Sequence, residues 1–248
     1  MTPYITPRKL LGDKRLPIPC ALAFVCYCPM PSVFDEFDLH IPLKERYFIH
    51  VHNMHIMIGQ YHETPFIVIS EVYGGPVSVT TVEELHYYGV ETIIGIGFVG
   101  ALKPSLPVGT IVVAEKALTE VGTTPHYQKN RDIFVKPTMK MNLNITMEPT
   151  CVWTTNALYQ EYPEDVKRAI GLGCSVVNMD TSHLYAACDL LDLNCQYYAV
   201  VTDVIGDHDW VNSLHDVVNT PTDSKSESPV LSQQTKLVLE LLSVIQYC

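Results

Sequence analysis

Runs of β-branched and apolar residues alternate with longer helix-like stretches along most of the chain, and this alternation restricts the fold more than any other feature. The runs end at Gly, Pro or polar turns, as buried strands do. Strands that alternate with helices form a mostly parallel sheet covered on both faces, so we expect residues 1–248 to form a single-domain three-layer α/β/α sandwich. Strands are predicted at 21–27, 55–61, 66–72, 92–96, 110–115, 151–154, 176–178 and 196–203, and helices at 77–88, 163–171, 181–191 and 229–246.

Composition and charge restrict the partners. The chain has 248 residues, 47% of them hydrophobic, and a formal net charge of −11. This negative charge repels nucleic-acid backbones and anionic membrane surfaces. We therefore expect a small neutral ligand and neither a nucleic-acid nor a membrane partner.

The cysteine pattern indicates a reducing compartment. The chain has 8 cysteines, and most lie in apolar runs, where free cysteine packs as a small hydrophobe. Their spacing matches no zinc motif, so we expect no metal, no cofactor and a cytoplasmic location. The apolar run 20–28 imitates a signal peptide, but prolines bracket it and it reads as a buried first strand. The polar segment 216–228 is predicted to be a loop that could cover a site.

Two carboxylates, Asp180 and Asp203, lie where predicted strands end. The C-terminal ends of strands are where open α/β sheets bind ligands. One carboxylate could bind hydroxyl groups while the other donates or accepts a proton. The pattern fits equally well with a second interpretation, in which Asp180 caps the following helix and Asp203 begins a turn.

Five segments, in the same order, resemble the nucleoside phosphorylases and related nucleosidases. Residues 91–100 (ETIIGIGFVG) resemble the family's central phosphate strand, and residues 68–76 (VISEVYGGP) resemble its Gly-Gly-Pro turn. Residues 153–159 (WTTNALY) resemble its base-stacking segment, and 177–182 (VNMDTS) and 201–203 (VTD) resemble its Val-Glu-Met-Glu and Val-Ser-Asp signatures. The resemblance implies cleavage of the N-glycosidic bond of a nucleoside.

The resemblance also implies a role for individual residues. Asp180 aligns with the glutamate that binds the ribose 2′- and 3′-hydroxyls, and Asp203 with the aspartate that protonates, or hydrogen-bonds to, a purine at N7. Tyr4 corresponds to a histidine donated across a dimer interface, which implies a homodimer or higher homo-oligomer with shared active sites. Further contacts are expected from Met179 beneath the ribose and from Leu158 and Tyr159 beside the base. Trp210, in the segment 207–210 (DHDW), is expected in a loop over the base, where it could stack.

The departures from the family pattern gather at its phosphate-binding positions. Gly95 and Phe98 stand where the family has an arginine and a serine or threonine. In the first strand Tyr27 and Pro31 replace the glycine and the arginine of a Gly-Asp-Pro-x-Arg run. These four residues form an altered phosphate site, and Tyr27 and Phe98 could fill its volume. A third family arginine comes from the neighbouring subunit, and its candidates here are Arg46, His50 and His52.

Loss of the phosphate ligands favours hydrolysis over phosphorolysis. In the resulting hypothesis water attacks C1′ of a nucleoside, and Asp203 favours a purine as the base. Two alternatives stay open: a phosphorylase with a rearranged phosphate site, and a protein that binds a nucleoside without cleaving it. The candidate bases for water are Asp35, Glu36, Glu71, His52 and His183, and the candidate phosphate ligands are Arg46, Lys103, His126 and His208.

Overall fold

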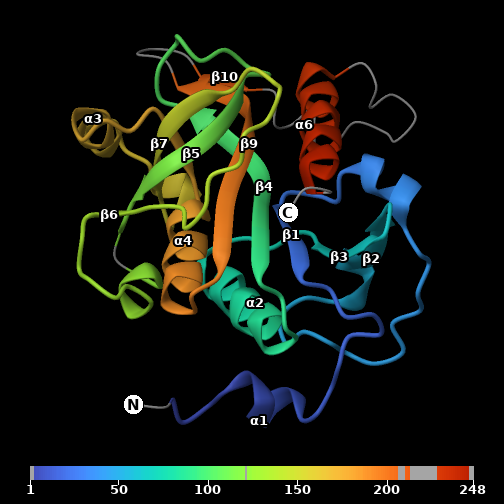
Figure 1. Ribbon diagram of the computed structural model, residues 1–248. Helices are drawn as coiled ribbons and strands as arrows, with labels where there is room; N and C mark the ends of the chain where they lie inside the picture. Colours follow the sequence, from blue (N-terminus) through green and yellow to red (C-terminus); the bar gives the residue numbers. More distant parts are fainter. Residues whose placement is uncertain (1–2, 121, 206–209, 213–227, 246–248) are drawn as a thin grey trace.

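A mixed ten-stranded sheet forms the centre of the protein, as the computed structural model shows (Figure 1). The structure describes residues 3–120, 122–205, 210–212 and 228–245. The sheet order is β10-β9-β5-β7-β8-β4-β1-β3-β2, and β6 pairs with β5. The strands are β1 (Leu22–Tyr27), β2 (Ile56–Tyr61), β3 (Thr64–Ile69), β4 (Thr92–Ala101), β5 (Ile111–Leu118), β6 (Phe134–Val135), β7 (Glu148–Thr154), β8 (Val176–Asn178), β9 (Asn194–Ile205) and β10 (Trp210–Asn212).

Helices cover both faces of the sheet, which confirms the predicted α/β/α class. Helices α2 (Gly75–Tyr87) and α4 (Thr181–Leu190) pack on one face, and α6 (Pro229–Ile245) packs on the other. Strand β1 shows why: Ala23 and Val25 point into the α2/α4 core, whereas Phe24 and Cys26 point into the α6 core, because successive strand side chains face opposite ways. The structure also has α1 (Pro7–Leu11), α3 (Pro163–Gly171) and the 3₁₀ segments η1 (Ser32–Phe37), η2 (Asn53–His55), η3 (Thr124–His126) and η4 (Leu158–Gln160).

Strand β4 pairs with three other strands of the sheet. It pairs in parallel with β1 and β9, and its end pairs antiparallel with β8. Because β9 also pairs with β5, and β7 joins β5 to β8, the strands β4, β9, β5, β7 and β8 close into a ring. The end of β4 therefore meets both β8, which precedes Asp180, and β9, which contains Asp203.

One sequence prediction about β4 is wrong. We expected the strand to end at residue 96, but it continues to Ala101, so that Gly97 and Gly100 lie within it as Gly95 does. Side chains from β9 and α4 approach the backbone of β4 closely, and glycine, which has no side chain, permits this approach within a strand. The other predicted strands and helices are confirmed, those at 163–171 and 176–178 with the predicted bounds and the rest with shifted ends, whereas α1, β6 and β10 were not predicted because they are short. Most of the predicted loop 216–228 lies outside the described residues.

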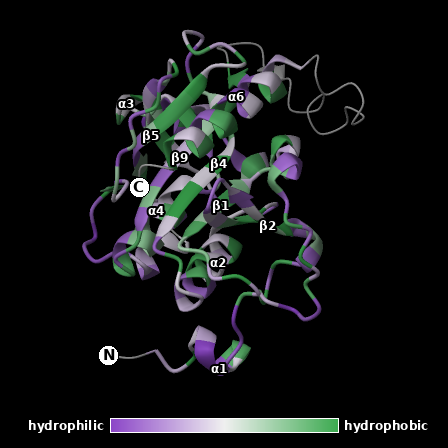
Figure 2. Cartoon of the chain, turned by 45° about the vertical axis from the view of Figure 1, so that its right-hand side comes forward, coloured by the Kyte–Doolittle hydropathy of each residue, from purple (hydrophilic) through white to green (hydrophobic). Residues whose placement is uncertain are grey.

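The distribution of apolar residues matches this layering. In Figure 2 hydrophobic residues are frequent in the strands and in the helices against them, and hydrophilic residues are frequent in the connections. The seven cysteines in the described part of the chain are buried and unbridged, in agreement with the packing role expected for them. Within the described residues, each helix is too short or too polar to cross a membrane.

Candidate active site

Asp180 lies at the junction of β8, α4 and the Gly-Gly-Pro turn. Its side chain is 5% exposed, and its Oδ1 accepts a hydrogen bond from the Gly74 N–H at 3.1 Å. Burial raises the pKa of Asp180 to about 7, although hydrogen bonds from the backbone of Gly74 and Met179 partly offset the shift. Met179 is half-buried beside it. The site thus holds a carboxyl group that titrates near neutral pH.

Asn178, and not Asp180, caps helix α4. The side chain of Asp180 makes no capping hydrogen bond to that helix. Instead Asn178 Oδ1 accepts from the N–H groups of Asp180 and Thr181 at 3.2 and 3.3 Å. The helix-cap interpretation of Asp180 is therefore wrong for α4, since this carboxylate binds the start of α2, where Gly74 is the N-cap residue.

The space beside Gly95 is filled by side chains from β9 and α4. A Cβ atom on Gly95 would lie 2.6 Å from Tyr197 Cδ2 and 2.7 Å from Leu184 Cδ2. At Gly97 the hydroxyl of Tyr197 would be 2.1 Å from a Cβ atom, and Tyr27 Cβ would be 3.2 Å away. Any side chain longer than that of glycine therefore collides with Tyr197 along this part of β4.

Tyr27 completes this aromatic filling. Its ring centroid lies 5.5 Å from that of Tyr197, and its hydroxyl shares a hydrogen bond of 2.8 Å with Ser78 Oγ on α2. Burial, more than any neighbouring charge, raises the pKa of the Tyr27 hydroxyl well above its ordinary value. The group is therefore neutral and hydrogen-bonded within the protein.

The four residues of the altered phosphate site do not share one environment. Gly95 and Tyr27 face the α2/α4 core, whereas Phe98 packs on the α6 core. Pro31 is buried at the start of η1. Tyr27 contributes to the filled space next to Gly97, where Tyr197, which the sequence did not indicate, comes closer.

We expect Gly95→Ala to lower the free energy of unfolding by about 2 kcal/mol, because overpacking a core typically costs 1–3 kcal/mol. Thermal and urea unfolding measure this change. Gly171→Ala in α3 is the matched control: a Cβ atom there meets nothing within 4 Å, so the unfolding free energy should rise by about 0.4–1 kcal/mol because alanine restricts the unfolded chain more than glycine. Equal stability of the two variants would show that Tyr197 does not fill the space beside Gly95.

Asp203 lies at an irregularity in the β4–β9 pairing. The register shifts between Val99 and Gly100, so that Asp203 comes opposite Gly100. Asp203 Oδ2 is 2.9 Å from the position that a Cβ atom on Gly100 would occupy, and Oδ1 accepts a hydrogen bond from Thr202 Oγ1 at 2.8 Å. The side chain is partly exposed. Gly100 thus leaves room for this carboxylate to lie against β4.

Glu161 is a candidate that sequence reasoning missed. It follows η4, in the loop after the predicted base-stacking segment. Burial, and then the charge of Asp203, raise the pKa of Glu161 to about 7. No motif includes this glutamate, so only its nearness in space to Asp203 identifies it.

Three of the predicted base and 5′ contacts are exposed in the single chain. Tyr4 is 89% exposed and Tyr159 is 92% exposed, while Leu158 is half exposed. The ring of Tyr4 lies 4.8 Å from the Lys9 ammonium group. The backbone of Trp210 pairs with Ile205 in the sheet, and its side chain lies outside the described part of the structure.

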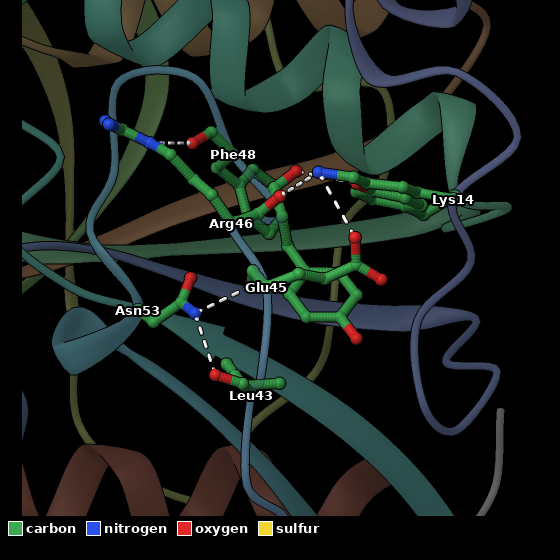
Figure 3. A network of polar contacts seen from close by, with 8 residues as sticks. Lys14, Leu43, Glu45, Arg46, Phe48 and Asn53 are labelled. Atoms are coloured by element: carbon green, nitrogen blue, oxygen red, sulfur yellow. Dashed lines mark hydrogen bonds and ion pairs between the residues drawn. The ribbon is translucent and has the colours of Figure 1, made fainter.

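The guanidinium group of Arg46 binds backbone carbonyls of its own loop. Figure 3 shows its guanidinium group beside the Phe48 carbonyl, to which Nε donates at 2.9 Å, and a second bond goes from Nη2 to the Ile49 carbonyl. Lys14 and Asn53 hold the same segment through the backbone carbonyls of Leu43, Glu45 and Arg46. The bonds to the Phe48 and Ile49 carbonyls occupy the Nε and Nη2 donors of Arg46, which a phosphate ligand would need. His50 and His52 are exposed.

Two candidate bases differ sharply in their surroundings. His183 is fully buried, its Nδ1 lies 2.6 Å from Thr124 Oγ1, and burial lowers its pKa to about 4. Glu71 is partly exposed, lies 3.7 Å from His55 Nδ1 and has a positive φ of 57°, which is rare outside glycine and frequent at functional sites. The geometry favours Glu71 over His183 as a group that can reach water.

The sequence profile of the phosphorylase superfamily matches residues 23–229, and the chain belongs to this superfamily of nucleosidases and nucleoside phosphorylases. The uncharacterized protein R802 of Acanthamoeba polyphaga mimivirus is 55% identical over 222 residues, which cover 88% of this chain and 90% of that protein.

Two solved structures are similar in fold. Uridine phosphorylase from Vibrio fischeri ES114 has a TM-score of 0.73 at 17% identity, covering 97% of this chain and 100% of that one. The 5′-methylthioadenosine/S-adenosyl homocysteine nucleosidase of Campylobacter jejuni has a TM-score of 0.67 at 16% identity, covering 92% and 100%. One relative is a phosphorylase and the other a nucleosidase, so the shared fold does not select the nucleophile.

Proposed function

We propose that the protein is a nucleosidase that hydrolyses the N-glycosidic bond of a purine nucleoside. The observation that carries this proposal is the filling of the space beside Gly95 and Gly97 by Tyr197 and Tyr27. A phosphate ion at this place would need both the volume and positive charge. The two tyrosines supply neither, since they are buried, neutral and in contact with each other.

The missing arginines have a large energetic effect. A hydrogen bond to a charged group contributes roughly 1.5–3 kcal/mol, so two absent arginines remove about 3–6 kcal/mol of phosphate binding. This corresponds to roughly a 10²- to 10⁴-fold loss of phosphate affinity. Water, at far higher concentration than phosphate, is the nucleophile that this site favours.

The remaining residues fit the parts of a nucleoside. Asp180, with Met179 beside it, is our candidate for binding the ribose hydroxyls, and Asp203 for assisting departure of the base. Glu71 is our candidate for accepting the proton of water, because it combines partial exposure with a position three residues before Gly74, the residue that binds Asp180. Glu71→Gln in a hydrolysis assay tests this role, and undiminished hydrolysis would exclude it.

Leu158, Tyr159 and Trp210 are our candidates for contacts with the base, and Tyr4 for a contact with the 5′ end in a partner subunit. The strong exposure of Tyr4 and Tyr159 supports contacts made outside the single chain. We therefore expect sedimentation velocity to give a dimer or a larger homo-oligomer. A monomer with full activity would exclude the role of Tyr4.

The decisive experiment is base release from a panel of purine and pyrimidine nucleosides, including 5′-methylthioadenosine, with and without phosphate. Chromatography then identifies the base and the sugar. We expect release that does not depend on phosphate and yields the free sugar. A sugar 1-phosphate formed only with phosphate would show a phosphorylase with a rearranged site, and binding without release would show a silent nucleoside-binding protein.

A further inference from the structure

A pair of buried cysteines lies between strand β7 and the turn that precedes β8. The Sγ atoms of Cys151 and Cys174 are 3.2 Å apart and share a hydrogen bond. Both side chains belong to a small core that also includes Trp153 and Ala169, and Cys151 is 6% exposed while Cys174 is 0% exposed. The two thiols are therefore in direct contact, although 23 positions separate them in the chain.

The backbone holds the two cysteines next to each other. The N–H of Ser175 donates to the Cys151 carbonyl at 2.9 Å, and the N–H of Cys174 donates to the Ala169 carbonyl at 3.0 Å. The residues that follow continue as the parallel pairing of β7 with β8. The S–S bond of a disulfide is about 2.0 Å long, so the two sulfur atoms need to approach by only about 1.2 Å, which is the scale of a side-chain rotation.

We propose that Cys151 and Cys174 form a redox-active dithiol, which peroxide converts to a disulfide and thiol reductants reopen. This inference does not depend on the proposed function. In a reducing compartment the dithiol is the resting form, and the disulfide forms where oxidation by peroxide is faster than reduction.

Cys151 is the thiol that reacts first. The hydrogen bond from Cys174 lowers the pKa of Cys151, and so does the ammonium group of Lys116, the residue opposite Cys151 in the β5–β7 pairing, although burial acts against both. The bond to Cys151 and burial raise the pKa of Cys174. Because the thiolate is the nucleophile, one sulfur of the pair is able to attack while the other keeps its proton.

Atoms and electrons balance with hydrogen peroxide as the oxidant. The Cys151 thiolate attacks one peroxide oxygen, the O–O bond breaks and hydroxide leaves, which gives a sulfenic acid at Cys151. Cys174 then loses its proton and attacks Cys151 Sγ, the S–O bond breaks and a second hydroxide leaves. The protons released by the two thiols convert both hydroxides to water. Two thiols and one peroxide thus give one disulfide and two water molecules.

Helix α3 is the element that packs against the pair at the outside of the fold (Figure 1). It has 9 residues, and Ala169 is the one that is fully buried. A short helix with few buried side chains opens locally at a low cost in free energy. A molecule as small as hydrogen peroxide can therefore reach Cys151, which is already slightly exposed, without global unfolding.

The disulfide closes a loop that runs from residue 151 to residue 174. This loop contains α3 and the segment of Leu158 and Tyr159. A cross-link that closes a loop restricts the unfolded chain and so stabilises the folded protein. We expect oxidation to raise the Tm by about 5–10 °C and dithiothreitol to reverse the shift.

The first test counts the thiols of the reduced full chain after treatment with hydrogen peroxide. Two of the 8 cysteine thiols should disappear and should return with dithiothreitol. Trypsin cleaves after Lys167 and Arg168, between the two cysteines, so mass spectrometry should find the peptides of Cys151 and Cys174 joined until they are reduced. Retention of all thiols, a loss that dithiothreitol does not reverse, or a disulfide located at other cysteines would overturn the proposal.

The second test compares single variants. Cys151→Ala and Cys174→Ala should each abolish both the paired loss of thiols and the rise in Tm. Cys20→Ala is the matched control, because Cys20 is also buried but its Sγ donates to the Ile18 carbonyl at 3.4 Å, and this variant should lose the same two thiols as wild type. A rise in Tm that persists in Cys151→Ala would contradict the proposal. If that variant does not fold, the peptide map of the wild-type protein decides.

Discussion

Asp203→Asn should slow base release by about 10³-fold, within the 10²- to 10⁴-fold contribution of general acid catalysis. The amide has nearly the same shape as the carboxylate, and its oxygen can still accept the hydrogen bond that Thr202 Oγ1 donates at 2.8 Å. Gly100 leaves the same room for it. The substitution therefore removes the proton while keeping the geometry. Single-turnover release of base measures the chemical step, and calorimetry measures nucleoside binding.

The affinity for nucleoside distinguishes loss of the catalytic acid from a general disturbance of the site. We expect the Kd of Asp203→Asn for the nucleoside to stay within a few-fold of wild type, since the sugar contacts are unchanged. Asp132→Asn, at an exposed carboxylate in a connecting segment, should leave both rate and Kd as they are. If turnover of Asp203→Asn were undiminished, Asp203 would have no part in the reaction.

The sequence predicts the layers of this fold but not the course of β4. Alternation of strand and helix patterns carries through to the structure because each pattern is local and each face is buried. The predicted strand ends at residue 96, so Gly97 and Gly100 were expected beyond it, and nothing local explains three glycines within one strand. Gly95 and Gly97 are glycines because Tyr197, about a hundred positions later, occupies the space where their side chains would be. Contacts this far apart in the chain leave no trace in a local pattern.

The candidate site, too, could be predicted from the sequence only in part. Asp180 and Asp203 could be predicted, because motifs and strand ends both point to them. That Asn178 caps α4 could not be predicted, since Asn and Asp are equally good capping residues. Glu161 could not be found either: its unusual property comes from burial and from Asp203 on another strand, and neither is visible in the residues around it.

Asp180→Ala should weaken nucleoside binding by about 10²-fold or more, because two hydrogen bonds from hydroxyl groups to a charged carboxylate contribute about 3–6 kcal/mol. The loss should appear in Kd for nucleosides but not for free bases, which have no ribose. Asp180→Asn is the sharper variant, because its side-chain oxygen can still accept from the Gly74 N–H and hold the turn in place. Unchanged affinity of both variants would mean that the ribose binds elsewhere.

The pH dependence of binding gives this prediction a second, independent readout. Burial raises the pKa of Asp180 to about 7, so the free protein holds a neutral acid below that pH and a carboxylate above it. Ribose hydroxyls donate to the carboxylate more strongly than to the acid, so binding favours the ionised form. Affinity should therefore rise as pH increases through about 7 and level off above it. In Asp180→Asn the affinity should not vary with pH in this way, because the amide does not titrate. If wild type and Asp180→Asn showed the same rise, a different group would be responsible for it.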